Sequence, residues 1–186
     1  MLFLTCIATL SENIKCLYPK DVESDPAEYT FDITCTSCRE VNDSKVSINR
    51  FEKHKMAGSR GEASFVMKCK FCKNDCSVTL TRTEESLYNL DEESNFELIE
   101  RAKSQRKKQG LKKFDVEQAV LLSLDCRGCE VANLNPENLV FIVELISGKK
   151  MECVFEDGEN EWYDYDEDTS EEVSVVDMKF DVVEGK

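Results

Sequence analysis

Hydrophobic and polar side chains alternate along much of this chain, and that pattern predicts β-strands. A period of two puts one set of side chains on one face of a sheet and the other set on the opposite face. The segment YTFDIT at residues 29–34 is the clearest case, because every second side chain is aromatic or aliphatic. Alternation, or a composition rich in β-branched and apolar residues, predicts strands at residues 1–10, 29–34, 45–51, 63–67, 77–82, 119–124, 139–146 and 174–183.

The middle of the chain has a different pattern, which predicts a short helix. Ser94 followed by Glu97 fits a capping box, with Ser94 as the N-cap. Phe96 and Ala102 belong to a thin apolar stripe at helical spacing, and Gly110 is the expected stop.

Residues 101–113 carry seven basic side chains in thirteen positions. We interpret this basic stretch as a solvated helix or insertion between two halves. A nuclear-localisation or nucleic-acid role is the alternative.

An acidic segment with three aromatic residues precedes the last predicted strand. Residues 156–172 hold ten acids in seventeen positions around Trp162, Tyr163 and Tyr165. Their Asp-x-Asp-x-Asp run resembles the start of a calcium loop, but Thr169 and Val175 stand where that loop needs Gly and Glu. We therefore predict a solvated acidic loop that its aromatic side chains anchor.

The two halves of the chain resemble one another in order. Residues 29–41 (YTFDITCTSCREV) align with residues 119–131 (AVLLSLDCRGCEV), and residues 67–72 (MKCKFC) align with residues 151–156 (MECVFE). This internal duplication predicts a mainly β fold in which two related antiparallel units pack as a sandwich with approximate two-fold symmetry, plus the short helical and basic insertion. The expected division is residues 1–90 with the first cysteine set, 91–116 as the insertion, and 117–186 with a degenerate set.

Composition and charge narrow the class of partner. The net charge of -14 argues against general nucleic-acid binding, in which Lys and Arg neutralise phosphates, and against anionic membranes. No apolar run approaches the 18 residues of a membrane span, and residues 1–10 lack the basic start of a signal peptide. We expect a cytoplasmic protein with a protein partner, and the basic stretch leaves a nuclear location open.

Cysteine spacing supplies the candidate chemistry. Six of the ten cysteines form three Cys-x-x-Cys pairs, a ligand pattern rather than a disulfide pattern in a reducing compartment. A tight turn lets both sulfurs of a pair face one ion, and two pairs complete the tetrahedron of a structural zinc site. The first two pairs each lie between predicted strands. We predict one zinc per chain, held by Cys35, Cys38, Cys69 and Cys72.

Other uses of these side chains are less favoured. The single histidine, His54, lies in a polar segment and is interpreted as an exposed bystander. Thiol–disulfide exchange normally needs a helix directly after the pair, and the residues after Cys38 lack helical periodicity. A closed four-thiolate zinc has no open position for water, and no activated Ser or Cys nucleophile is evident. The sequence therefore predicts a protein that is not an enzyme.

Several segments resemble a family of eukaryotic CXXC-motif-containing zinc-binding proteins, also called UPF0587 or DUF866. The resemblance covers nearly the whole chain and is carried most strongly by SRGEASFVMKCKFC at residues 59–72, then by CRG at 126–128 and WYDYD at 162–166. It implies a β-rich fold with one zinc on the two N-terminal pairs. Cys129 and Cys153 depart from the family pattern, and residues 101–113 look like an insertion.

Three functions follow from these observations, in order of preference. The first is a non-catalytic module in which zinc fixes the fold and a surface around Trp162 recognises a protein. The second is metal handling, in which Cys126, Cys129 and Cys153 pass zinc or copper to a partner. The third is a thiol–disulfide oxidoreductase.

Overall fold

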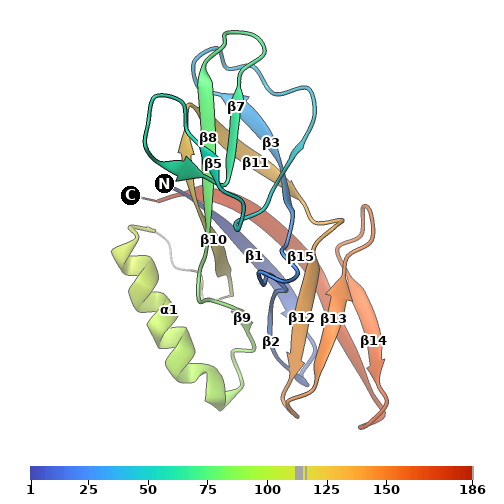
Figure 1. The fold of residues 1–186 in the computed structure, drawn as a ribbon. Helices are drawn as coiled ribbons and strands as arrows, with labels where there is room; N and C mark the ends of the chain where they lie inside the picture. The colour runs from blue at the N-terminus through green and yellow to red at the C-terminus, as the bar shows by residue number, and fades with distance from the viewer. Residues whose placement is uncertain (112–114, 116, 186) are drawn as a thin grey trace.

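The computed structural model describes residues 1–111, 115 and 117–185, and it is mainly antiparallel β-sheet with one short helix, as predicted (Figure 1). The elements in chain order are β1 (Leu2–Leu10), β2 (Ile14–Pro19), β3 (Tyr29–Cys35), β4 (Val46–Ile48), β5 (His54–Lys55), β6 (Glu62–Ala63), β7 (Phe65–Lys68), β8 (Asp75–Arg82), β9 (Leu87–Tyr88), η1 (Glu93–Asn95), α1 (Phe96–Lys108), β10 (Ala119–Arg127), β11 (Cys129–Asn135), β12 (Val140–Leu145), β13 (Lys150–Val154), β14 (Trp162–Asp166) and β15 (Glu171–Glu184).

Strand pairing has an approximate internal two-fold symmetry. β1 and β10 lie side by side at the centre of a six-stranded sheet of order β14-β15-β1-β10-β8-β7. β15 and β8 flank this central pair, and β14 and β7 form the two edges. In one smaller sheet β2 pairs with β12, which pairs with β13; in another β11 pairs with β3, which pairs with β4. The series β1, β2, β3, β4, β7, β8 therefore corresponds to β10, β11, β12, β13, β14, β15.

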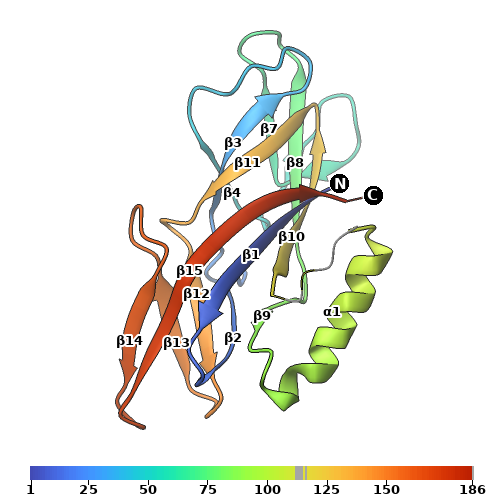
Figure 2. The ribbon, with the colours of Figure 1, turned by 180° about the vertical axis from the view of Figure 1, so that it is seen from behind.

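This symmetry is real, but the sequence alignment that suggested it was wrong in register. That alignment equated β3 with β10, whereas the pairing makes β1 the counterpart of β10 and β12 the counterpart of β3. The alignment depended mainly on the Cys-x-x-Cys pairs in the two segments. Any two such pairs can be aligned, whether or not their strands correspond in the fold. Each of these three sheets contains strands from both units, so the units are intertwined (Figure 2).

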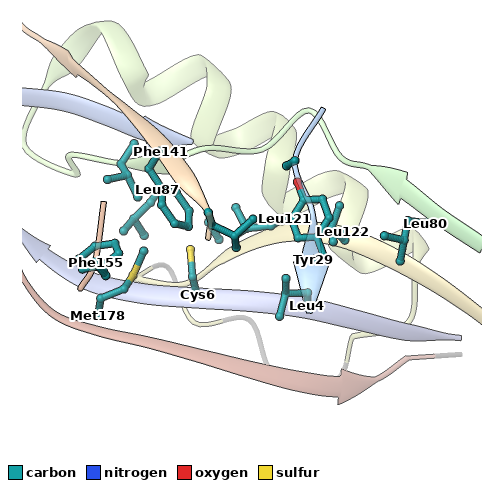
Figure 3. Close-up of a cluster of buried hydrophobic side chains, with 14 of the residues drawn as sticks. Leu4, Cys6, Tyr29, Leu80, Leu87, Leu121, Leu122, Phe141, Phe155 and Met178 are labelled. Carbon is teal, nitrogen blue, oxygen red and sulfur yellow. The ribbon is translucent and has the colours of Figure 1, made fainter. Parts of the chain in front are cut away.

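One continuous hydrophobic core joins the six-stranded sheet to the two smaller sheets. Figure 3 shows Leu4 of β1 beside Tyr29 of β3, and Cys6 of β1 on the side of Phe141 of β12 and Leu87 of β9. The side chains of β3 alternate strictly between buried and half-buried, as period two requires. Burial of this apolar surface is the main stabilising contribution, at roughly 25 cal/mol per Å².

The helix is present, but its start differs from the predicted capping box. Glu92, not Ser94, is the cap of the 3-10 turn η1, because its carboxylate accepts from the Ser94 N–H at 3.3 Å. Asn95 precedes α1 in a helical conformation and caps nothing. Its buried amide donates instead to the backbone oxygens of Lys15 and Asn89. The intervening 3-10 turn leaves Phe96 exposed, so it does not join Ala102 on the buried face.

The predicted stop at Gly110 is confirmed. Gly110 has φ of +70° and donates to the carbonyl of Lys107, while Leu111 donates to the carbonyl of Arg106. These two bonds form a Schellman motif. The predicted basic stretch thus covers most of α1 and its cap; Lys112 and Lys113 lie outside the described residues.

The acidic segment at residues 156–172 is only partly the predicted loop, because a strand interrupts it. Residues 162–166 form strand β14, paired in register with β15 from Trp162↔Val175 to Asp166↔Glu171. The sequence did not predict this strand, because only Trp162 and Asp166 face the protein and the other side chains are exposed. With so many acidic residues, β14 lacks the usual row of hydrophobic side chains on its inner face. β2, β11 and β13 were also missed, and β4 is shorter than predicted.

Arg106 attaches α1 to the sheets. Its guanidinium binds the Glu85 carboxylate at 2.8–3.2 Å and also donates to the backbone oxygens of Asp115 and Gln118. Glu85 in turn accepts from the backbone N–H of Val120, the second residue of β10. Both charged side chains are less than a tenth exposed. One basic residue of the stretch is therefore structural rather than solvated.

None of the helices in the described part of the chain has the length and apolar character that crossing a bilayer requires.

Replacing Arg106 by Ala is expected to lower the free energy of unfolding by about 3–5 kcal/mol, because it leaves the Glu85 carboxylate buried and unpaired. Urea unfolding of the purified protein would measure this. Arg101→Ala is the matched control, since its ion pair with Glu97 is exposed and is worth about 0.5 kcal/mol or less. Equal losses in the two variants would contradict a structural role for Arg106.

Candidate metal centre

Two hairpin tips with the same backbone geometry present the predicted ligands. Cys35 ends β3, its N–H donates to Glu40 O, and its carbonyl accepts from the N–H of Arg39. The tip between β7 and β8 repeats these bonds with the same spacing: Cys69 N–H donates to Asn74 O and Cys69 O accepts from the Lys73 N–H. Arg39 and Lys73, each four residues after the first cysteine, share a left-handed φ of +63°. Each tip curls back so that both of its sulfurs face the other tip.

The four predicted ligands form one cluster. The Sγ atoms of Cys35, Cys38, Cys69 and Cys72 all lie within 4.8 Å of one another. Cys35 Sγ lies 3.6 Å from Cys72 Sγ, and Cys38 Sγ lies 3.6 Å from Cys69 Sγ. Four sulfurs at tetrahedral corners, 2.3 Å from a zinc ion, would be separated by about 3.8 Å. The spacing and the all-thiol donor set therefore fit zinc with little adjustment.

Backbone N–H groups favour the thiolate form that zinc requires. The N–H groups of Cys38 and Ser37 point at Cys35 Sγ and lower the pKa of that thiol to about 6. In the second tip the N–H groups of Cys72 and Phe71 lower the pKa of Cys69 in the same way. Hydrogen bonds to the charged form stabilise it, so the tips prepare two of the four ligands before metal arrives.

A third segment holds the two tips together. Gly128, between β10 and β11, accepts hydrogen bonds at its carbonyl from the Thr36 N–H of the first tip and from the Asn74 amide of the second, at 3.1 and 3.2 Å. The Asn74 amide also lies 3.7 Å from Cys35 Sγ. Gly128 has φ of +72°, and a Cβ on it would collide with the backbone oxygen of Asp75. In the sequence, Gly128 belongs to the CRG motif that carries the family resemblance, and its position between two strand-like segments is the signal that could have identified its structural role.

The other cysteines do not complete a second centre. Within the described residues, the quartet is the only group of three or more His, Cys, Asp or Glu side chains close enough to share an ion. Cys126, Cys129 and Cys153 are therefore not among the side chains that could share an ion. Cys153 is fully buried, and burial raises the pKa of its thiol to about 12. His54 is exposed and bonds Glu52, as a bystander would.

An ion pair occupies the position that the two-fold symmetry assigns to the metal in the second unit. The metal joins the β3–β4 tip to the β7–β8 tip, so its counterpart must join the β12–β13 tip to the β14–β15 tip. Lys149 in the first of these binds Asp166 at 2.9 Å and Asp168 at 3.1 Å in the second. The Lys149 ammonium lowers the pKa of the Asp166 carboxyl, which is almost fully buried. The second unit thus replaces four cysteines with a lysine between two aspartates.

Comparisons with known proteins agree with this geometry. A family model described as "CXXC motif containing zinc binding protein, eukaryotic" matches residues 3–183. UPF0587 protein YCR090C of Saccharomyces cerevisiae is 45% identical over 185 residues, covering 100% of this chain and 99% of that one. The human CXXC motif containing zinc binding protein is 27% identical, covering 92% and 90% of the two chains. The crystal structure of C1orf123 has a TM-score of 0.73 at 25% identity and covers 98% of each chain.

Gly128→Ala is expected to lower the free energy of unfolding of the zinc-loaded protein by about 3 kcal/mol or more, since it combines a backbone collision with a left-handed φ. Urea unfolding and a chelator competition for zinc would measure stability and metal affinity together. Gly158→Ala is the matched control, because Gly158 has φ of +75° and open space around its Cα. It should lose only about 1 kcal/mol. Similar losses in both variants would show that φ alone constrains Gly128.

Proposed function

This chain belongs to the eukaryotic family of CXXC motif containing zinc binding proteins, and on that premise we propose that it is a non-catalytic zinc protein that binds a partner protein. Zinc would be held by Cys35, Cys38, Cys69 and Cys72, one ion per chain. Its role would be structural, because it ties together two hairpin tips that have few apolar side chains of their own.

The observation that carries this proposal is the closed ligand set. Four thiolates fill the four positions of a tetrahedral zinc, so none remains for a water or a substrate. Catalytic zinc sites keep one position open, and this one has no carboxylate or imidazole in its ligand set. The family description and the name of the human relative describe zinc binding, and neither these nor the name of the yeast relative gives an enzymatic activity.

The surface that we assign to the partner is the exposed face of β14. Tyr163 and Tyr165 are large exposed side chains, and Tyr is enriched among residues that anchor interfaces. Trp162, the anchor favoured by the sequence, is instead half-buried against the core and fixes the strand. The acidic charge around the tyrosines favours a protein partner over a nucleic acid or an anionic membrane.

Metal transfer through Cys126, Cys129 and Cys153 has less support, since these side chains do not form a ligand group. A thiol oxidoreductase has less support as well. Neither Cys-x-x-Cys pair of the quartet is followed by a helix that would lower the pKa of an exposed nucleophile.

Metal content is the first test. Elemental mass spectrometry on protein purified without added metal should find one zinc per chain, and Cys69→Ser should lose both the zinc and the folded structure, because zinc binding supplies about 10–16 kcal/mol to such sites. The double variant Cys126→Ser/Cys129→Ser is the control and should keep one zinc. Zinc retained by Cys69→Ser, or two metals per chain, would contradict the single structural site.

The same control variant, Cys126→Ser/Cys129→Ser, distinguishes the partner-binding hypothesis from the metal-transfer hypothesis. Affinity purification with the tagged, zinc-loaded chain should recover the same partners with Cys126→Ser/Cys129→Ser as with the native sequence. Metal-free protein should recover none of them. If the double variant loses its partners while keeping its zinc, metal transfer replaces the binding-module proposal.

A further inference from the structure

β14 is an open edge of the six-stranded sheet. Among the residues that the structure describes, its only strand neighbour is β15, and Figures 1 and 2 show it at the outer border of the molecule, at the end opposite the zinc hairpins. In an antiparallel pair, alternate residues direct both backbone N–H and C=O toward the partner strand, and the others direct them away. Part of the backbone of β14 is therefore available to a further strand.

The side chains of β14 form two rows with different surroundings. Trp162 packs against the core, and Asp166 is buried and bound to Lys149. Packing accounts for these two residues. Tyr163 and Tyr165 belong to the opposite row and are 64% and 48% exposed. Nothing in the packing of the fold requires two aromatic rings there.

Charge around this edge is strongly one-sided. Residues 156–172 contain ten acids and no basic residue, and Glu172 lies directly across from Tyr165 on β15. The nearest lysine on the facing hairpin, Lys149, is already bound to Asp166 and Asp168. Acids on an edge strand repel a second copy of the same strand, which protects the protein from self-association. The same acids attract a segment of opposite charge.

We propose that β14 binds an extended segment of the partner protein as an added strand, with Lys or Arg at alternate positions lying beside Tyr163 and Tyr165. This inference rests on the proposed binding-module function and specifies its partner. Backbone hydrogen bonds to the open edge supply a fixed register. The two tyrosines stand about 7 Å apart along the strand, which is the spacing of residues i and i+2 in the added strand. Their rings take the cations by cation–π contact, and the surrounding carboxylates form charge-assisted hydrogen bonds.

The test uses a defined probe and the zinc-loaded full chain. A fluorescent peptide in which arginine alternates with threonine should bind, as followed by fluorescence anisotropy. A second peptide, in which the backbone nitrogens of the central arginine and threonine are both N-methylated, has the same charge but lacks backbone donors on either side of the strand, and it should bind at least about tenfold more weakly. Amide hydrogen exchange should show added protection in β14 and none in β7, the opposite edge of the same sheet.

Variants test the tyrosine row. Tyr163→Ala/Tyr165→Ala should weaken the alternating peptide about tenfold, whereas Tyr163→Phe/Tyr165→Phe should bind as the native protein does, because both rings remain. Phe96→Ala is the matched control, since Phe96 is an equally exposed aromatic residue on α1. Zinc content confirms that each variant is folded.

Two results would overturn the proposal: no binding of the alternating peptide, or equal binding of the N-methylated peptide with no added protection in β14. The second result would show attraction by charge alone. Either result leaves the binding-module function in place if zinc content and partner recovery behave as described above. Loss of partner recovery from the zinc-loaded protein would remove that function as well.

Discussion

Four thiolates brought to one point are the constraint on which the zinc-bearing end of this fold depends. The tips that carry them are short and polar, and Phe71, the large apolar side chain of the second tip, is exposed. Hydrophobic burial therefore cannot hold the tips together, and the metal must. The backbone conformation of both tips and the pairing of β11 position the four sulfurs for the metal. Arg39 and Lys73 take left-handed conformations that glycine would adopt more readily, and the backbone of β11 pairs beside Cys35.

The linkage runs from the metal into the centre of the six-stranded sheet. Gly128 bonds both tips and directly follows β10, one of the two central strands. Gly128 thereby connects the metal-binding tips to β10, which pairs with β1 and, through β1, lies in the same sheet as β15 and β14. The same sheet thus has a metal-bound hairpin at one edge and an acidic strand with two exposed tyrosines at the other. Zinc can fix the shape of a surface that it does not touch.

Local patterns in the sequence were sufficient for the ligand quartet, most of the strands and the glycine that ends the helix. Each depends on residues close together in the chain: a two-residue spacing, an alternation, or one residue that tolerates positive φ. Strand pairing was not predictable, because it depends on contacts between distant segments, and the duplication was aligned out of step, with β3 set against β10 instead of β12. The acidic strand was interpreted as a loop because only two of its five residues face the protein, and one of these two is an aspartate. It therefore shows no row of hydrophobic residues on its inner face. Gly128, Asn74 and Lys149 act on partners far away in sequence.

The two ends of the molecule are held together by different interactions. An ion pair of Lys149 with two aspartates joins the hairpins at the β14 end, and a zinc ion on four cysteines joins those at the other end. A zinc ion must be obtained from the cell, competes with other thiol ligands for its place, and is sensitive to oxidants that modify cysteine. An ammonium group is covalently part of the chain and is present as soon as the chain is made. The contact that closes the β14 end therefore needs nothing from outside the chain, whereas the contact that closes the cysteine end needs an ion that the chain must acquire.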